Sequence, residues 1–351
     1  MYSTTTVVLV LATFGGAMAL DCIQILDSEI RIGNTVYIPG GSGELQPIPA
    51  NFNCVYTIKA PIYTGTAAIV TLKNGLRGVN DYIVVTEQDG HTKTIYNRTT
   101  GIPDHYTVIP EAEMTIQVVT RSVFMGSKFL ITVQYQSSNV GPNIPMKTGG
   151  EMNFFDLSTL RDGRSVFNSV TFVGTEPIFM SLAIGPNGAL DCWDCFVVDG
   201  TVSNQTRVYR LDDISMRPFV TTSNAITIFT SVDDFFGVVL NPVSESSQFQ
   251  SLYSLATVPV EDNESAMRTF TPGFLGAAEV VNFASTGIIM SRVTIMSPTC
   301  EAYVVSGPPN NSSTILLNLS NVTMPHNFDL KYFSVINKNC TFEFEVRSYN
   351  D

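Results

Sequence analysis

The stretch Phe129-Leu-Ile-Thr-Val-Gln-Tyr135 carries an aromatic or β-branched side chain at every second position, and most of the residues between them are more polar. A period of two is typical of a β-strand with one buried face. Three more runs rich in β-branched and aromatic residues are bounded by Gly, Asn, Asp or Pro. These runs are Ala67–Leu72, Tyr82–Val85 and Met114–Val119. No window of about twelve residues has a convincing helical period, so the sequence predicts an all-β protein.

The pattern of strands recurs along the chain, which points to repeated structural units. The run Asn51–Ile58 resembles Val166–Phe172. An acidic residue leads a strand three times, at Asp81–Val85, Asp194–Val198 and Glu301–Val305. Each time a closing strand follows, at Phe129, Gly237 and Phe342, and the strand before closure is expected at Met114–Ile116, Ala225–Ile228 and Phe328–Leu330. The repeat predicts three β units of about 100 residues, the size of one β-sandwich.

The first residues have the pattern of a secretory signal peptide. Residues 1–20 contain no Lys, Arg, Asp or Glu, and an apolar run from Val7 ends at the small residues of a cleavage site, Ala17-Met-Ala19. A buried strand or a membrane anchor is the alternative. An anchor needs about 20 apolar residues, and Gly15-Gly16 and Asp21 shorten this run. We expect cleavage after Ala19, secretion, and no membrane span elsewhere.

Polar stretches suggest where the units end. Ser137–Pro145 is rich in Ser, Gly and Pro, and a second polar stretch extends from Asn241 to Ser265. Such stretches are typical of connections between folded units. The expected organisation is a signal peptide at 1–19, a first β-sandwich at 20–138, a second at 148–245 and a third at 262–351.

The charge of the chain excludes one class of partner. The formal net charge is −12, only 14% of the residues are charged, and there is no basic run. Binding to nucleic-acid phosphates requires clustered Lys and Arg, and anionic lipid attracts the same residues. The sequence therefore predicts neither a nucleic-acid partner nor electrostatic adsorption to a membrane.

Asn-x-Ser/Thr sequons are numerous, as expected for a secreted glycoprotein. The eight acceptors are Asn97, Asn204, Asn263, Asn310, Asn311, Asn318, Asn321 and Asn339. Most of them lie in the last third of the chain. Asn310 and Asn311 overlap and are not expected to carry glycans together, and at Asn339 the neighbouring Cys340 can compete with glycosylation through disulfide formation.

Six cysteines in a secreted chain suggest three disulfides, although the sequence alone allows fifteen connectivities. The spacing favours the local pairs Cys22–Cys54, Cys192–Cys195 and Cys300–Cys340, because each then stays inside one unit. Cys192-Trp-Asp-Cys195 also has the spacing of a redox motif. A reactive thiolate needs nearby positive charge, whereas Asp191 and Asp194 flank these sulfurs, so a structural bridge is expected. A zinc site would need a second Cys or His pair.

Two segments resemble the signature strand of the CUB domain, namely Asn80–Gly90 and Asp191–Gly200. The segment Pro47-Ile-Pro-Ala-Asn-Phe-Asn-Cys-Val-Tyr-Thr-Ile58, which follows Cys22, resembles the nematode-type CUB-like family of secreted proteins, and the close match covers 20–138. This resemblance implies an antiparallel β-sandwich of the jelly-roll kind without catalytic activity. It also implies a role in extracellular defence against bacteria.

Many CUB domains bind calcium through a Glu, the Asp of the signature strand and a later Asp, because Ca²⁺ prefers oxygen ligands. This sequence departs from that pattern. Asp81 has Lys73 at the Glu position and Ser122-Val123 where Ser-Asp is expected. In the second unit Asp194, Asp233 and Asp234 are present, but Pro186 stands at the Glu position. We expect no metal site and no cofactor.

Catalytic motifs are absent from the sequence. The three histidines, His91, His105 and His326, are expected in loops, and no zinc-protease, serine-hydrolase or phosphate-loop motif occurs. The acid pairs Asp212-Asp213 and Asp233-Asp234 are expected to be solvated. The sequence thus favours a non-catalytic extracellular binding protein of innate immune defence, with a glycan or protein ligand. The alternatives are a structural or matrix glycoprotein of an epithelial surface and, least favoured, an unrecognised hydrolase.

Overall fold

The computed structural model describes most of the chain after the predicted signal peptide, which lies outside the described residues. The described ranges are 22–96, 102–122, 126–160, 163–185, 192, 194–215, 218–231, 236–257, 265–271, 275–283, 287–295 and 300–348. In these ranges the structure is almost entirely β, as predicted. Two short α-helices occur, α1 (Leu211–Ser215) and α2 (Val243–Ser246). Among the described residues no helix has the length and apolar character needed to cross a membrane.

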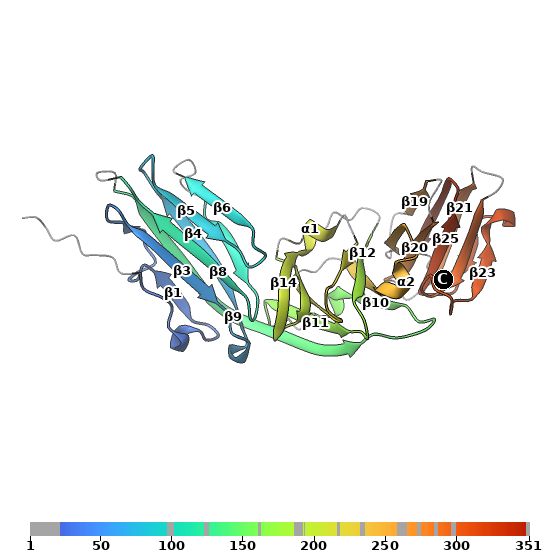
Figure 1. Cartoon of the computed structure of the whole chain (residues 1–351), viewed down its shortest axis with the longest axis horizontal. Helices are drawn as coiled ribbons and strands as arrows, with labels where there is room; N and C mark the ends of the chain where they lie inside the picture. Colours follow the sequence, from blue (N-terminus) through green and yellow to red (C-terminus); the bar gives the residue numbers. More distant parts are fainter. Residues whose placement is uncertain are drawn as a thin grey trace, which may run out of the picture.

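Three β units follow one another along an elongated molecule (Figure 1). The first unit contains η1 (Asp27–Glu29), β1 (Thr35–Ile38), β2 (Gln46–Pro47), β3 (Asn53–Lys59), η2 (Ile62–Thr64), β4 (Thr66–Gly75), β5 (Tyr82–Thr86), β6 (Thr92–Tyr96), β7 (Asp104–Val108), β8 (Glu113–Val119) and β9 (Lys128–Pro145). One sheet has the order β3-β8-β5-β6, and in the other β4 lies between β9 and β7. Every pairing within this unit is antiparallel.

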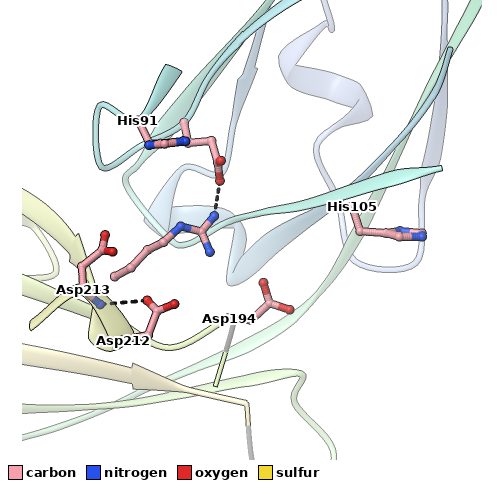
Figure 2. A pocket seen from close by; sticks show the side chains of 7 residues that line it. His91, His105, Asp194, Asp212 and Asp213 are labelled. Carbon is pink, nitrogen blue, oxygen red and sulfur yellow. Dashed lines mark hydrogen bonds and ion pairs between the residues drawn. The ribbon is translucent and has the colours of Figure 1, made fainter. Parts of the chain in front are cut away.

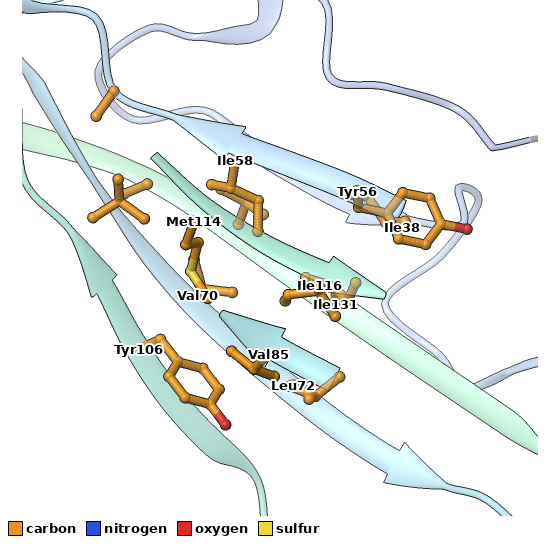
Figure 3. Close-up of a cluster of buried hydrophobic side chains, with 14 of the residues drawn as sticks. Ile38, Tyr56, Ile58, Val70, Leu72, Val85, Tyr106, Met114, Ile116 and Ile131 are labelled. Atoms are coloured by element: carbon orange, nitrogen blue, oxygen red, sulfur yellow. The ribbon is translucent and has the colours of Figure 1, made fainter. Parts of the chain in front are cut away.

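The core of the first unit lies between these two sheets. Alternate residues of β3 face inward, so that Tyr56 and Ile58 are fully buried while Val55 is exposed. From the opposite sheet Val70 and Leu72 of β4 point toward them (Figure 3). The period of two in the sequence thus reflects one buried face per strand.

The second and third units are built in the same way from two packed sheets. The second contains β10 (Asn153–Asp156), η3 (Leu157–Leu160), β11 (Phe167–Val173), β12 (Ile178–Ile184), β13 (Phe196–Thr201), β14 (Asn204–Arg210), α1, β15 (Phe219–Val220), β16 (Ala225–Thr230) and β17 (Phe236–Pro242), followed by α2. The third contains β18 (Ser251–Thr257), β19 (Ala266–Phe270), β20 (Leu275–Asn282), β21 (Ile288–Ile295), β22 (Glu301–Ser306), β23 (Ile315–Asn318), η4 (Leu319–Asn321), β24 (His326–Phe328), β25 (Tyr332–Lys338) and β26 (Phe342–Ser348). The prediction of Phe328–Leu330 as the strand before closure is wrong, because β25 precedes the closing strand β26.

The stretch Ser137–Pro145, predicted as a polar connection between units, is not an irregular linker but the second half of strand β9. After pairing antiparallel with β4, β9 continues into the second unit and pairs parallel with β11, from Ser138 opposite Phe167 to Pro145 opposite Val173. The order β14-β13-β16-β11-β9-β4-β7 is therefore one continuous sheet across two units. Where the register shifts, a Cβ at Gly141 would lie 2.0 Å from the carbonyl oxygen of Ser169, so glycine is required there.

The polar stretch from Asn241 onward is also structured rather than a plain linker. It contains the end of β17, α2 and the strand β18. Strand β18 pairs parallel with β12 of the second unit and parallel with β20 of the third. The backbone hydrogen bonds of one sheet thus pass from the second unit to the third, as they pass from the first to the second through β9.

A buried carboxylate lies at this second junction. Glu279 of β20 is fully buried, and both of its carboxylate oxygens accept hydrogen bonds from the Asn241 Nδ2 at 3.0 and 3.1 Å. The Ser254 hydroxyl donates to Oε2 at 3.3 Å and lies 2.5 Å from the Ser181 hydroxyl. Burial raises the pKa of Glu279 to about 7, because these neutral donors offset only part of the cost of removing the charge from water.

Replacement of Glu279 by Gln should make the protein more stable at alkaline pH. The folded-state pKa lies above the ordinary value, so the stability that the protonated form contributes is complete below about pH 4.5 and is lost as the pH rises through about 7. The Gln variant cannot ionise, so its melting temperature should exceed that of the wild type by several degrees at pH 8 and match it at pH 5. Differential scanning calorimetry across this range measures the effect. Glu301→Gln, which removes an exposed carboxylate, is the control and should show no such divergence. Equal melting temperatures of wild type and Glu279→Gln at pH 8 would contradict a buried charge at this position.

Candidate functional site

A cleft of about 490 Å³ lies where the first two units meet. It is lined by Glu87, His91, His105, Asp194, Arg210, Asp212 and Asp213. The first three of these belong to the first unit and the other four to the second. In Figure 2 His91 and His105 extend from the strands and turns of the first unit, while Asp194, Asp212 and Asp213 approach from the second. Residues far apart in the chain meet here because β9 places the two sandwiches side by side.

Arg210 is the central side chain of the cleft. Its guanidinium forms an ion pair with Glu87, and its Nε lies 3.2 Å from the Asp89 carboxylate. It also lies over the ring of Phe196, 5.5 Å from the centroid. All three charged side chains are mostly buried: Arg210 is 18% exposed, Glu87 9% and Asp89 6%. This ion pair therefore joins the last residue of β14 to the turn after β5 across the unit boundary.

Burial and charge act in opposite directions on this cluster. Burial raises the pKa of Glu87, and the neighbouring Arg210 lowers it by less, so the pKa of Glu87 remains above its usual value. Burial lowers the pKa of Arg210, but Glu87 and Asp89 outweigh this effect and the pKa of Arg210 is raised. Arg210 is thus firmly charged and is already neutralised by two carboxylates.

Further contacts join the two units beside the cleft. The Thr107 hydroxyl of β7 donates to the Asp194 carboxylate at 2.9 Å, and the Gln205 Nε2 donates to the Pro110 carbonyl at 2.7 Å. Apolar side chains of the second unit also pack into the hydrophobic core of the first. They are Phe196, Val198, Val202, Val208 and Phe229. Polar and apolar contacts together thus join the first and second units, whose residues form the two sides of the cleft.

The outer part of the cleft is acidic. Asp212 and Asp213 occupy the first turn of α1, where the Asp213 N–H donates to the Asp212 carboxylate at 3.0 Å. Both residues line the cleft together with Asp194, a grouping that the sequence does not indicate. With Arg210 balanced by Glu87 and Asp89, these aspartates leave the cleft with a negative charge. Such an arrangement favours a positively charged group.

The histidines differ from the sequence expectation. His91 lies just before β6, but His105 is part of β7 and His326 is part of β24, so the prediction of three loop histidines is wrong for two of them. His91 and His105 are exposed on the rim, and the His105 Nδ1 lies 3.2 Å from the Thr71 hydroxyl. No signal in the sequence indicates that these two residues share a cleft with Asp212 and Asp213.

Asp81, the acid of the CUB signature, is a structural anchor in this chain. It is 1% exposed, and its Oδ1 accepts from the backbone N–H of Arg121 at 2.9 Å and of Ser122 at 3.1 Å. The Ser127 hydroxyl donates to its Oδ2 at 2.5 Å. Burial raises the pKa of Asp81, but the hydrogen bonds from Ser127, Arg121 and Ser122 outweigh burial and leave the pKa below its usual value. Protein donors thus satisfy both oxygens of the Asp81 carboxylate.

The described residues contain no group of three or more His, Cys, Asp or Glu that could hold a metal ion. Lys73, at the expected Glu position, is exposed on β4, and Asp194 accepts the hydrogen bond from Thr107. Four residues of the calcium comparison lie outside the described residues: Val123, Pro186, Asp233 and Asp234.

The structure has three disulfides, and they are the local pairs favoured by spacing: Cys22–Cys54, Cys192–Cys195 and Cys300–Cys340.

The sequons lie mostly at the surface. Asn97 and Asn263 lie outside the described residues, and five acceptors are exposed: Asn204, Asn311, Asn318, Asn321 and Asn339. Asn310 differs, because its Nδ2 donates to the Gly149 carbonyl at 2.9 Å and to the Glu245 carboxylate at 2.6 Å. Of the overlapping pair, Asn311 is therefore the exposed member.

Comparison with known proteins identifies the first unit. Residues 17–139 match the model of the CUB-like domain family, so a CUB-like domain spans this part of the chain. No curated protein matches the chain.

Among solved structures, the CUB1-EGF-CUB2 domains of rat MASP-1 are 9% identical over 62% of this chain and 99% of that chain, with a TM-score of 0.23. The triple jelly-roll protein of an archaeal virus is 10% identical over 89% of each chain, with a TM-score of 0.26. The extracellular region of zebrafish Gpr126/Adgrg6 is 10% identical over 94% of this chain and 53% of that chain, with a TM-score of 0.25. Likenesses of this strength carry no argument about the function of this chain.

Replacement of Arg210 by Met should weaken the junction between the first two units. The variant keeps the apolar stem but leaves Glu87 and Asp89 buried without their cation, which costs about 3 kcal/mol in comparable buried pairs. Urea unfolding measures the loss. Arg207→Met on the same strand is the control, because the Arg207 guanidinium lies over the Tyr209 ring and not in this ion pair. In a double-mutant cycle, Glu87→Gln should cost less in the Arg210→Met background than in the wild type. An equal cost in both backgrounds would show that the pair does not join the units.

Replacement of Asp81 by Asn should destabilise the first unit at neutral pH. Because the folded-state pKa is lowered, the contribution of the ionised carboxylate is present above its unfolded-state pKa and is lost as the pH falls through the folded-state value. We expect a loss of about 2 kcal/mol at pH 7 that shrinks below about pH 4, measured by urea unfolding. The control Glu113→Gln removes only an exposed pair with Lys59. An equal loss of stability at pH 7 and at pH 3 would contradict an anchoring role of the ionised carboxylate.

Proposed function

We propose that this chain is a secreted, non-catalytic glycoprotein that binds a ligand in extracellular defence against bacteria, and that the cleft between its first two units receives a positively charged group of that ligand. The observation that carries the proposal is the acidic cleft itself, which a shared sheet holds in place. The CUB-like domain supports an extracellular binding role, and the resemblance of residues 20–138 to secreted defence proteins supports the biological setting.

The shape of the cleft suits recognition without rearrangement. Its walls are joined by the parallel pairing of β9 with β11, by the Arg210 ion pairs and by apolar packing. Preformed sites bind with a smaller entropic cost than sites that must be ordered by the ligand. A cleft of about 490 Å³ is also within the range of small-molecule and oligosaccharide sites.

The charge of the cleft selects the kind of ligand. Asp194, Asp212 and Asp213 face a space in which Arg210, the only cation among the described lining residues, is already paired. An anionic ligand would meet repulsion there, whereas an ammonium group would be attracted. Amine-bearing glycans combine this charge with the hydroxyl groups that polar side chains such as His91 and His105 can bind.

The chemistry of the described part of the cleft fits binding better than catalysis. Nucleophilic catalysis often uses a Ser, Cys, Thr or Lys beside a base, and the lining residues that the structure describes include none of these types. The two aspartates of α1 are adjacent on one helical turn and have no geometry that would flank a scissile bond from both sides.

Binding of matched oligosaccharides tests the proposal. Glucosamine oligomers carry free amines, whereas N-acetylglucosamine oligomers of the same length are neutral. The purified glycoprotein should bind the former more tightly, and binding should weaken as salt is added. Asp212→Asn/Asp213→Asn should weaken binding by about tenfold, which corresponds to about 1.4 kcal/mol.

The control variant Glu44→Gln/Glu301→Gln removes the same amount of charge from exposed positions outside the cleft and should bind like the wild type. Equal binding of both oligomers, or equal weakening by both variants, would overturn the role of the cleft.

Binding of the glycoprotein to whole bacteria tests the defence setting. Ordered self-assembly without any ligand would instead favour the alternative, a structural glycoprotein of an epithelial surface.

A further inference from the structure

The sheets of this molecule leave several strands at their edges. The strand orders end at β14 and β7, at β10 and β23, at β19 and β24, and at β3 and β6. An edge strand presents unpaired backbone N–H and C=O groups, which are a template for pairing with another chain. Soluble β proteins therefore cover or interrupt their edges.

Some of these edges are covered by the protein itself. Gln24 lies beside β3, where its Nε2 donates to the Val55 carbonyl at 2.8 Å and its Oε1 accepts from the Thr57 N–H at 3.2 Å. The disulfide Cys22–Cys54 fastens this segment to the strand. Strand β7 lies against the second unit, through the bond from Thr107 to Asp194.

The edge at β23 has no comparable cover among the described residues. Its first two residues are exposed apolar side chains, Ile315 at 60% and Leu316 at 41%. Strand β22 pairs with it on one side only. A short, exposed apolar edge of this kind is a site for edge-to-edge association between copies of one chain.

Glycan acceptors surround this uncovered edge. Asn311 precedes β23 by four positions, Asn318 is its last residue, and Asn321 ends the η4 turn that follows it. All three are exposed. Strand β14, another edge, begins with the exposed acceptor Asn204. In contrast, Asn339 lies between β25 and β26, which are both paired on two sides.

We propose that N-linked glycans on Asn311, Asn318 and Asn321 cover the edge of β23 and prevent its antiparallel pairing with β23 of a second copy of this chain. Two equivalent edges meet about a twofold axis in such a dimer, with the strands about 4.8 Å apart. A four-residue strand is about 13 Å long, so bulky hydrophilic glycans at both ends obstruct the whole edge. The inference rests on the glycosylation included in the proposed function, and it is independent of the ligand in the cleft.

The test compares the secreted full-length protein with acceptor variants. Peptide mass spectrometry first establishes occupancy of the three acceptors. Light scattering coupled to size-exclusion chromatography then measures molar mass over a concentration series. The wild type and the control Asn339→Gln should be monomeric. Asn311→Gln/Asn318→Gln/Asn321→Gln should at least double its molar mass at high concentration, and adding Ile315→Lys, which places a charge on the edge, should restore the monomer.

A second measurement avoids variants that fail to fold. Enzymatic trimming of the folded wild-type glycans to a single sugar leaves the sequence intact and should also promote association. Three results would each overturn the inference. The first is that the three sites of the secreted protein carry no glycans, and the second is that both the triple variant and the trimmed protein are monomeric. The third is association that Ile315→Lys does not reverse. Loss of amine-glycan binding with normal monomer behaviour would contradict only the proposed function of the cleft.

Discussion

The parallel pairing of β9 with β11 is the constraint on which the rest of the structure depends. A strand that closes the first sandwich and then joins the second cannot rotate freely between them, because its backbone hydrogen bonds belong to both. Parallel neighbours usually need a long crossover connection, and here the segment between β9 and β11, which contains β10 and η3, provides it. The same solution recurs at β18, which pairs with β12 and β20. The three units thus form one continuous structure, and the cleft at the first junction has a defined shape.

The sequence predicts the individual strands well because their signal is local. Alternation in Phe129–Tyr135 and the Gly, Asn and Pro residues that bound each run reflect one buried face and tight turns. The disulfide pairs are also local, so spacing alone favours them. The junction strands have no such signal. Residues 139–145 of β9 are mostly exposed or half-buried, and their Ser, Asn, Gly and Pro content is typical of a loop. Only the distant β11 makes this segment a strand.

The candidate site could not be predicted from the sequence either, because its residues are brought together only by contacts between distant strands. Arg210 is one of two arginines on an edge strand, and nothing near it in the sequence indicates that it pairs with Glu87 and Asp89. Asp212 and Asp213 are ordinary acids of a helical turn until the junction brings them opposite His91 and His105. By contrast, Asp81 could be singled out, because it leads the signature strand. What the sequence could not show is that two backbone N–H groups and the Ser127 hydroxyl satisfy its carboxylate.

Asp81 and Glu279 are both buried carboxylates, but their surroundings shift their pKa values in opposite directions. Both are at most 1% exposed, yet the pKa of Asp81 is lowered and that of Glu279 is raised to about 7. The difference lies in the donors. Two backbone N–H groups and a hydroxyl converge on Asp81, whereas Glu279 has one amide group and one hydroxyl. Asp81 therefore stabilises the loop before β9 as a charged group. Glu279, at the junction of the second and third units, is better accommodated in its protonated form, so the two buried carboxylates respond to pH in opposite ways.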